Sequence, residues 1–318
     1  MSAATLGRIA IVGSGAVGAY YGARLAHAGE DVTFLMRRDL AAVRARGLTV
    51  RVFSGQKPLE RFHLERVSAC GSTAEIGPVD LVIVGLKATA DGAMRELLPP
   101  LLHARTAVLT LQNGLGSDER VARDFGADRV LGGLCFVCLN RVGGPDDVPA
   151  IECYHPGSVS LGELGRPAGD RARAIGAAFQ RAGVKCTVAD NLAEVRWRKL
   201  IWNVPFNGLS IAAGGVTTDR ILADTSLLAE VRELMREVQR AAAAQGIAIP
   251  DEFLQKQIDV TGPMGAYKPS SLIDYLDGKA VEVEAIWGEP LRRARAAGVP
   301  MPYLEKLYAR LRELCVVS

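Results

Sequence analysis

Three side chains that could hold and protonate a small oxygenated molecule recur at regular spacing in the second half of the chain. Lys199, Asn203 and Asn207 lie four residues apart within the stretch EVRWRKLIWNVPFNG. On an α-helix such residues share one face, which would carry an ammonium and two amides. The surrounding residues are strongly apolar, and burying polar groups is costly unless each has a partner. The stretch therefore predicts either a core helix with satisfied amides or a ligand-binding face.

A second motif with chemical meaning lies near the start of the chain. The run Gly13-Ser14-Gly15-Ala16-Val17-Gly18 follows a β-branched strand at residues 8–12 and precedes a helix at 19–29 and a strand at 31–36. In this context the first glycine makes a tight turn, the second lets the backbone approach a pyrophosphate, and the third packs helix against strand. The helix N-terminus offers free N–H groups to the anion. The run therefore predicts a dinucleotide-binding loop formed by these six residues.

The end of the second strand distinguishes the two nicotinamide cofactors. NAD-binding folds place an Asp or Glu there to hold the ribose 2′-hydroxyl, whereas this chain has Arg37 and Arg38, followed by Asp39. A guanidinium suits the 2′-phosphate of NADP in charge and in geometry. The alternative is that these arginines are simply solvated at a strand end. We expect NADP, with Arg37 as the leading contact.

Two further polar residues follow predicted strands. Lys87 comes at the end of the apolar run at residues 79–86, and Asn113 follows the run at 106–111. Ligands of open α/β sheets bind beyond the carboxyl ends of the strands. A lysine or an asparagine at a strand exit can also be an ordinary turn residue. Beside a dinucleotide motif, these two residues are predicted to contact the cofactor, and Asn113 also the substrate.

The composition excludes several functional classes. Of the 318 residues 49% are hydrophobic and 23% charged, and the net charge is +3. This balance favours a globular protein with no nucleic-acid partner. No run of 18 apolar residues exists, so we expect no membrane span and a cytoplasmic location. Cys135 and Cys138 form a CxxC, but on the apolar strand expected there the thiols would diverge. Free cysteines in a reducing compartment and no metal site are therefore predicted.

The chain changes character after about residue 190. Before it we expect strands at 130–140 and 184–188, a hairpin at 151–161 broken by Pro156-Gly157, and a helix at 171–183. After it the pattern is helical, with helices predicted at 217–246, 250–260, 280–297 and 302–314. The predicted fold is α/β: a Rossmann-type dinucleotide-binding domain at residues 1–190 and an all-helical domain at 191–318. An apolar helical domain makes a homodimer plausible.

The ordered set of motifs resembles the ketopantoate reductase (2-dehydropantoate 2-reductase) family over essentially the whole length. The residues that carry the resemblance are Gly13, Gly15 and Gly18, Arg37, Leu86-Lys87-Ala88, Asn113-Gly114, Trp197-Arg198-Lys199-Leu200, Asn203, Asn207, Ser270-Ser271 and Glu282. The resemblance implies NADPH as cofactor and a small 2-keto acid as substrate. It also implies ketopantoate reduction in pantothenate biosynthesis as the activity.

The resemblance implies a role for each matching residue. Lys199 would donate a proton to the keto oxygen, because a desolvated ammonium is a stronger acid. Glu282 would orient Lys199 or the substrate, or contact the cofactor; alternatively it is a solvated glutamate on a helix. The positions that match substrate-binding ones are Asn113, Lys199, Asn203, Asn207 and Ser271. Ser271 could instead only cap a helix, and Ser270 competes with it for the role.

Some residues depart from the family pattern. Gly208 stands where members commonly have proline, Trp287 replaces an asparagine, and Glu284 an aspartate. The spacing from Ser271 to Glu282 is also one residue shorter than in typical members. These changes could reshape the substrate pocket, so a reductase of another 2-keto acid remains an alternative. A non-catalytic NADPH-binding sensor is a third hypothesis, and the presence of both Lys199 and Glu282 argues against it.

Overall fold

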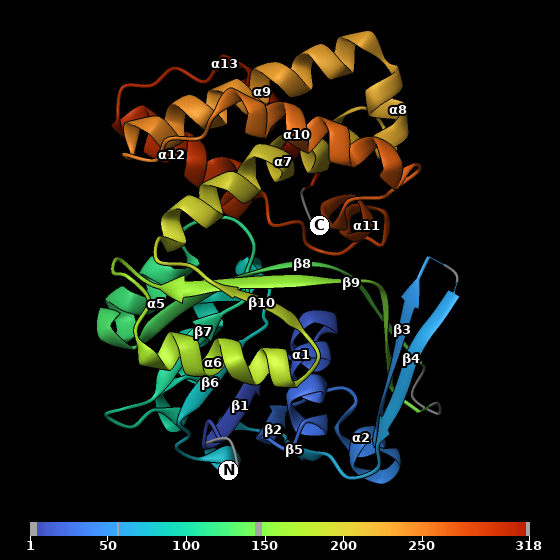
Figure 1. Cartoon of the computed structure of the whole chain (residues 1–318), viewed down its shortest axis with the longest axis vertical. Coiled ribbons are helices and arrows are strands. Elements are labelled where there is room, and N and C mark those ends of the chain that lie inside the picture. The colour runs from blue at the N-terminus through green and yellow to red at the C-terminus, as the bar shows by residue number, and fades with distance from the viewer. Residues whose placement is uncertain (1–4, 56, 144–147, 316–318) are drawn as a thin grey trace. The chain divides into compact units, whose positions relative to one another are not determined.

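The computed structural model describes residues 5–55, 57–143 and 148–315. The chain folds into two compact units. One holds the described residues up to Gln112 together with Ser117–Leu192, and the other holds Asn113–Gly116 and the described residues from Ala193 on. Figure 1 shows the strands of the first unit in blue to green and the helices of the second in yellow to red. The fold is the predicted one: a Rossmann-type α/β unit and a helical unit.

A parallel sheet forms the centre of the first unit. Its strands run in the order β8-β7-β6-β1-β2-β5. Their bounds are β1 (Arg8–Val12), β2 (Asp31–Leu35), β5 (Ser68–Cys70), β6 (Leu81–Val84), β7 (Ala107–Thr110) and β8 (Val130–Val142). Strands that are buried on both faces, such as β6 and β7, read as continuous apolar runs, which explains why these strands were visible in the sequence.

Two apolar cores lie on opposite faces of the sheet, because successive residues of a strand point to opposite sides. Ile9 and Ile11 of β1 pack into one core with residues of α1 (Ala16–His27) and α6 (Asp170–Arg181), which lie along one face in Figure 1. Ala10 and Val12 pack into the other core. The remaining helices of the unit are α2 (Leu40–Arg46), α3 (Thr73–Ile76), η1 (Ala88–Ala93), α4 (Met94–Leu97), η2 (Pro99–Leu101), α5 (Ser117–Phe125) and η3 (Ala127–Arg129).

Further strands extend the sheet beyond β8, to ten strands within the described residues. They are β9 (Ala150–Glu163), which is antiparallel to β8, and then β10 (Lys185–Val188), β3 (Leu48–Ser54) and β4 (Lys57–Leu64). The sequence reading missed β3, β4 and β5. Most residues of β4 are exposed, so the apolar alternation that marks a half-buried strand is weak there.

The hairpin predicted at residues 151–161 is wrong. Strand β9 runs without a break through Pro156-Gly157 and forms the hairpin with β8 instead. The register of the two strands shifts between Phe136 and Leu139, opposite the Pro-Gly pair. A bulge of this kind accommodates a residue that cannot donate to the ladder. Gly157 has a φ of +39°, and a Cβ there would overlap the carbonyl of Phe136.

Helices alone form the described part of the second unit apart from its connections. They are α7 (Leu192–Ala212), α8 (Thr218–Ala223), α9 (Thr225–Ala244), α10 (Asp251–Thr261), η4 (Gly262–Met264), α11 (Ser270–Leu276), the π-helical turn η5 (Glu284–Gly288), α12 (Glu289–Ala296) and α13 (Pro302–Leu314). Their common core includes Trp197, Met235 and Trp287. In the part of the chain that the structure describes, none of the helices is both long and apolar enough to cross a bilayer.

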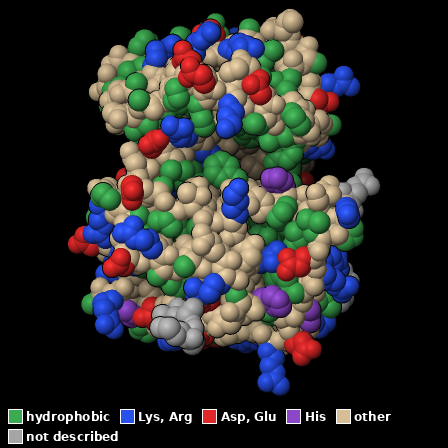
Figure 2. Space-filling view, viewed as in Figure 1, with side chains coloured by type: hydrophobic (Ala, Val, Ile, Leu, Met, Phe, Trp, Pro, Cys, Tyr) green, Lys and Arg blue, Asp and Glu red, His purple; other side chains and the backbone are tan. Residues whose placement is uncertain are grey.

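Two of the predicted helices are divided. The helix expected at residues 217–246 is α8 and α9, because the carboxylate of Asp224 accepts from the N–H groups of Ser226 and Leu227 and starts a new helix. The helix expected at 280–297 begins as the π-helical turn η5 and continues as α12. On the face shown in Figure 2, cationic and anionic side chains are interspersed, in keeping with the small net charge.

Candidate active site

In the glycine-rich loop between β1 and α1, Gly13 makes the tight turn and Gly18 makes the close helix packing that the sequence predicts. Gly13 has a φ of +96°, and a Cβ there would overlap the backbone nitrogen of Leu86. A Cβ on Gly18 would overlap the carbonyl oxygen of Gly13, so the helix packs closely on the turn. Only glycine fits either position. These two residues shape the loop and pack it against the end of β6.

The open position of the loop is Gly15. A Cβ there would have no atom within 4 Å, and Gly15 is also the N-cap of α1, with no side-chain hydrogen bond to cap the helix. An uncapped helix N-terminus beside a glycine is suited to an anionic group. Ala16 and Val17 form the first turn of α1, where backbone N–H groups lack helical acceptors. The loop therefore fits the pyrophosphate of a dinucleotide.

The predicted cofactor residues of the first unit lie at the carboxyl ends of its strands. Arg37 and Arg38 follow β2 and are exposed. Lys87 follows β6, is half-buried and is the N-cap residue of η1. Ser14 differs from the expectation in detail, because its hydroxyl donates to the carbonyl of Leu35 at 2.7 Å. The hydroxyl of Ser14 is thus used on the end of β2, and Ser14 would contact a ligand through its backbone groups.

In the helical unit, Lys199 belongs to a polar chain of three residues. Its Nζ donates to Oδ1 of Asn113 at 2.7 Å, and Nδ2 of Asn113 donates to Oε2 of Glu282 at 3.3 Å. Glu282 is 8% exposed, so the carboxylate is largely shielded from solvent. The amide of Asn113 uses its acceptor on the ammonium and its donor on the carboxylate. An ammonium, an amide and a carboxylate that are far apart in sequence are thereby held in one line.

Asn113 reaches this cluster because the segment Asn113–Gly116 packs with the helical unit. The N–H of Leu115 donates to the carbonyl of Ala285 in η5 at 3.0 Å. Gly114 has a φ of +79°, and a Cβ there would overlap the same carbonyl. The buried Arg196 of α7 donates from Nη1 to the carbonyl of Gly114 at 3.2 Å. Helix α7 and the π-helical turn together position Asn113.

Arg196 is a residue that the sequence reading missed. It precedes Lys199 by three residues and so lies on the same side of α7. A second cation three residues before Lys199, on the same side of the helix, was the available signal. By contrast, Arg198 pairs with Glu194 at 2.8 Å and lies over the ring of Phe253. Its guanidinium is therefore engaged away from the polar chain of Lys199.

The other predicted substrate residues lie further along α7 and on α11. Asn207 is 1% exposed, and its Oδ1 accepts from the backbone N–H of Ser271 at 3.0 Å. Asn203 is 7% exposed, one turn from both Lys199 and Asn207. Of the two serines, Ser271 is buried and lies beside Asn207, whereas Ser270 is exposed. Ser271 rather than Ser270 therefore has the placement of a site residue.

The two departures at Gly208 and Trp287 are one packing change. A Cβ on Gly208 would lie 2.8 Å from Nε1 of Trp287 and 2.7 Å from Cδ2 of Leu307. The indole N–H of Trp287 donates to the carbonyl of Val204 at 2.9 Å, and the side chain is fully buried. The large residue at 287 thus fills the space that the absent side chain at 208 leaves. Both face the core of the unit.

Glu284, the third departure, belongs to the surface. Its carboxylate accepts from the hydroxyl of Tyr308 at 2.6 Å and from Arg292 at 2.8 Å. Partial burial raises the pKa of Glu284, but these two donors outweigh that effect and the pKa is lowered. The side chain is more than half exposed. Glu284 therefore remains an ionised surface residue that ties η5 to α12 and α13.

The cysteines take no part in the cluster. All six are free. Burial raises the pKa of the Cys138 thiol above its ordinary value and raises the pKa of the Cys186 thiol to about 12. A thiol with a raised pKa is a poor nucleophile and a poor metal ligand. Among the residues with described placement, no three His, Cys, Asp or Glu side chains are grouped as metal ligands would be.

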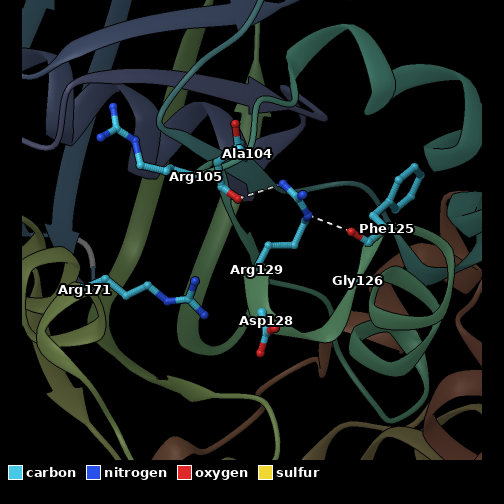
Figure 3. Close-up of a pocket in the computed structure, with 8 residues that line it drawn as sticks. Ala104, Arg105, Phe125, Gly126, Asp128, Arg129 and Arg171 are labelled. Atoms are coloured by element: carbon cyan, nitrogen blue, oxygen red, sulfur yellow. Dashed lines mark hydrogen bonds between the residues drawn. The ribbon is translucent and has the colours of Figure 1, made fainter.

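A cavity of about 280 Å³ lies in the first unit, at the N-terminal ends of β7 and β8. Figure 3 shows Arg129 in this cavity, pointing toward Phe125. Arg129 donates to the carbonyl of Phe125 at 2.7 Å and to that of Thr106 at 3.1 Å. Its guanidinium is thus engaged with protein acceptors. Cofactors of open α/β sheets bind at the carboxyl ends of the strands. The cavity lies at the opposite edge and holds none of the predicted site residues.

The residues brought together in the helical unit can perform acid catalysis. An ammonium held by an amide can polarise a carbonyl and give it a proton. Buried amides and a hydroxyl nearby can accept and donate hydrogen bonds to a small polar molecule. The first unit supplies a loop suited to a dinucleotide. This combination is that of an oxidoreductase acting on a small carbonyl compound.

Comparison with known proteins identifies the family. The model for "Ketopantoate reductase PanE/ApbA" matches residues 9–165, and the model for its C-terminal part matches residues 191–314. A 2-dehydropantoate 2-reductase from Nostoc sp. is 39% identical over 96% of this chain and 95% of its own. The crystal structure of 2-dehydropantoate 2-reductase from Geobacter metallireducens is 42% identical, with a TM-score of 0.90 over 96% of this chain and 99% of its own. That from Methylococcus capsulatus is 30% identical, with a TM-score of 0.87 over 96% of each chain. The chain belongs to the ketopantoate reductase family of oxidoreductases.

Proposed function

We propose that this protein reduces 2-dehydropantoate to pantoate with NADPH, the reductive step of pantothenate biosynthesis. The observation that carries the proposal is the 2.7 Å hydrogen bond from Nζ of Lys199 to Asn113, which is itself bonded to Glu282. These are the residues that the family resemblance assigned to the reaction. The curated relatives named as 2-dehydropantoate 2-reductases support this substrate.

NADPH, when bound, supplies the hydride that reduces the keto carbon. The residues that would hold it are the loop 13–18, through its backbone and the open side of Gly15, and Arg37 and Lys87 at the strand ends. Arg37 is exposed and would pair with the 2′-phosphate. Asn113 and Glu282 would add contacts from the helical unit.

Lys199 is the proposed proton donor. As the keto oxygen takes on alkoxide character, the ammonium transfers a proton to it, and the neutral amine that remains regains a proton from solvent. The carbonyl of Asn113 accepts one N–H of Lys199, which fixes the direction of the remaining two. Glu282 acts through Asn113, because its bond to Nδ2 selects the amide orientation that presents the oxygen to Lys199.

The substrate would be held further along the same helix. Asn203, one turn on from Lys199, is nine-tenths buried and offers both an amide donor and an acceptor. Asn207 keeps its amide nitrogen as a donor, because its oxygen is used on the backbone of Ser271. The hydroxyl of Ser271 completes the set. Two amide donors and a hydroxyl suit a ligand that carries a carboxylate and a hydroxyl group, as 2-dehydropantoate does.

The packing of Gly208 against Trp287 also supports this substrate. The two residues were the main sequence departures from the family, and they compensate each other in the core. Neither replaces a side chain of the polar set formed by Lys199, Asn203 and Asn207.

The test is steady-state NADPH oxidation with 2-dehydropantoate and a panel of other 2-keto acids, using the wild type and Lys199→Ala. We expect 2-dehydropantoate to be the best substrate. Loss of a general acid should lower kcat by about 10²–10⁴-fold, while the Kd for NADPH stays close to that of the wild type. Arg198→Ala is the matched control, because it removes a neighbouring cation of the same helix that pairs with Glu194.

Three results would count against the proposal. Unchanged turnover by Lys199→Ala would remove Lys199 as the donor. An equal loss in Arg198→Ala would show that the effect comes from disturbing the helix. Turnover of 2-dehydropantoate no faster than that of simple 2-keto acids would leave the reaction type but overturn the substrate.

A further inference from the structure

Arg141, near the end of β8, contacts two segments of the predicted cofactor site. From Nη1 it donates to the carbonyl oxygen of Ser14 in the glycine-rich loop. Its Nη2 forms an ion pair with Oδ2 of Asp39 at 2.5 Å. The side chain of Arg141 is 23% exposed and that of Asp39 is 39% exposed. One guanidinium thus joins the pyrophosphate loop to the segment that follows β2.

Asp39 uses its carboxylate on Arg141 rather than on its own helix. It is the N-cap residue of α2, a position where an aspartate commonly accepts from the first turn, but it makes no such bond. The loop on the other side is also fixed, since the hydroxyl of Ser14 donates to Leu35 at the end of β2. The ion pair with Arg141 is therefore the feature that directs this carboxylate.

The position of Asp39 matters for the choice of cofactor. It follows Arg37 and Arg38 directly, at the strand end where dinucleotide-binding folds read the adenosine ribose. A carboxylate there can accept from a ribose 2′-hydroxyl, which favours NADH. The same carboxylate repels a 2′-phosphate, which disfavours NADPH. A carboxylate engaged by a guanidinium can do neither well.

We propose that Arg141 sets the cofactor preference by engaging Asp39, so that the end of β2 presents only the cations Arg37 and Arg38 to the ribose. Arg141 is a positioning residue, because it acts through Asp39 and Ser14. The inference rests on the proposed use of NADPH, and it assigns part of the selectivity to a residue on a strand remote in sequence from the dinucleotide motif.

The test measures the Kd of NADPH and of NADH, by quenching of tryptophan fluorescence, for the full chain and its variants. In Arg141→Met, which keeps an unbranched side chain without the guanidinium, Asp39 is released. We expect NADPH to bind more weakly and NADH more tightly, so that the preference falls by about tenfold or more. Adding Asp39→Asn to this variant should restore the preference, because the released charge is gone. Arg141→Lys should retain most of it.

Arg51→Met provides the matched control. Arg51 is also a strand arginine of this unit, on β3, and its ion pair at 3.0 Å is with Glu152 of β9. It should leave the preference unchanged. Asp39→Asn alone gives a second test that does not depend on the folding of the Arg141 variants. It should keep or increase the preference for NADPH, because Asp39 is not a ligand of the ribose in this proposal.

The outcomes separate this inference from the proposed function. A wild type that binds NADH as tightly as NADPH would overturn the proposed cofactor. A wild type that prefers NADPH, with the same ratio in Arg141→Met, would overturn only the role of Arg141. If Arg141→Met weakened the binding of NADPH and NADH equally, and adding Asp39→Asn did not reverse this, the ion pair would have only a structural role. If Asp39→Asn alone abolished NADPH binding, Asp39 would be a ligand of the cofactor.

Discussion

The pairing of Gly208 with Trp287 predicts the effect of a single added methyl group. In Gly208→Ala the new Cβ would lie 2.7 Å from Cδ2 of Leu307 and 2.8 Å from Nε1 of Trp287. Real Cβ atoms do not come this close to their neighbours, and both neighbours are buried. The indole is also held by its bond to Val204, so it cannot move without losing that bond. We therefore expect the substitution to destabilise the helical unit.

Two opposing effects set the change in the free energy of unfolding that Gly208→Ala causes. Overpacking a buried position costs about 1–3 kcal/mol, and alanine is favoured over glycine inside a helix by about 1 kcal/mol. The net expectation is a loss of about 1 kcal/mol. Gly262→Ala isolates the steric part, because Gly262 has helical backbone angles and nothing lies within 4 Å of its added Cβ. It should gain the propensity term alone, so the two variants should differ by about 1–3 kcal/mol.

Urea unfolding followed by far-ultraviolet circular dichroism measures both variants. Trp287→Phe in a double-mutant cycle tests the contact itself, since it removes Nε1 and with it the closest polar neighbour of the new methyl group. The cost of Gly208→Ala should then shrink by about 0.5 kcal/mol or more. Stabilisation of Gly208→Ala to the same extent as Gly262→Ala would refute the packing argument. Additivity of Gly208→Ala and Trp287→Phe would refute the coupling.

Two further predictions concern the helical unit. Burial raises the pKa of Glu237 above its ordinary value of 4.5, although the carboxylate accepts from the N–H groups of Tyr303 and Leu304. Protonation of Glu237 therefore stabilises the folded state. This contribution is complete below 4.5, the pKa in the unfolded chain, and is lost as the pH rises through the higher pKa of the folded protein. In urea unfolding, the free energy of unfolding of the wild type minus that of Glu237→Gln should fall as the pH rises above 4.5. A difference that does not change with pH would contradict this prediction. Arg196→Met removes the donor to the carbonyl of Gly114, so misplacement of the segment Asn113–Gly116 should lower kcat by up to about 10²-fold without weakening NADPH binding. Arg196→Lys should recover part of the rate, and an unchanged kcat in Arg196→Met would exclude this positioning role.

The sequence predicted those parts of the molecule whose signal is local. The strand at residues 8–12, the glycine-rich loop and the spacing of Lys199, Asn203 and Asn207 are each readable within one segment, and the fold class that they indicated is confirmed. The catalytic and binding roles of these residues stay predictions. Strand β4 was missed because its exposed residues carry no clear alternation, whereas β3 (LTVRVFS) does alternate and could have been predicted.

Other features depend on pairing between distant segments. The break expected at Pro156-Gly157 follows from local turn chemistry, and only the bulge in β8 opposite it keeps the strand continuous. Arg141 and Ser14 are 127 residues apart, so no local pattern around either residue predicts their contact. The same holds for Trp287 and Val204, which are 83 residues apart. Long-range register decided these features, and a single sequence does not encode it in a readable pattern.

Because Asn113–Gly116 belongs to the helical unit, that unit cannot be completed until late in the synthesis of the chain. During synthesis this segment emerges well before its partners, because Asn113 and Glu282 are 169 residues apart. At about 5–20 residues per second, the segment would wait on the order of ten seconds or longer for that partner. A fragment beginning at Ala193 would lack the segment entirely and would leave the carbonyl of Ala285 without its bond to Leu115. The helical unit is therefore discontinuous in sequence, and a gene cut at the start of α7 would not encode all of it.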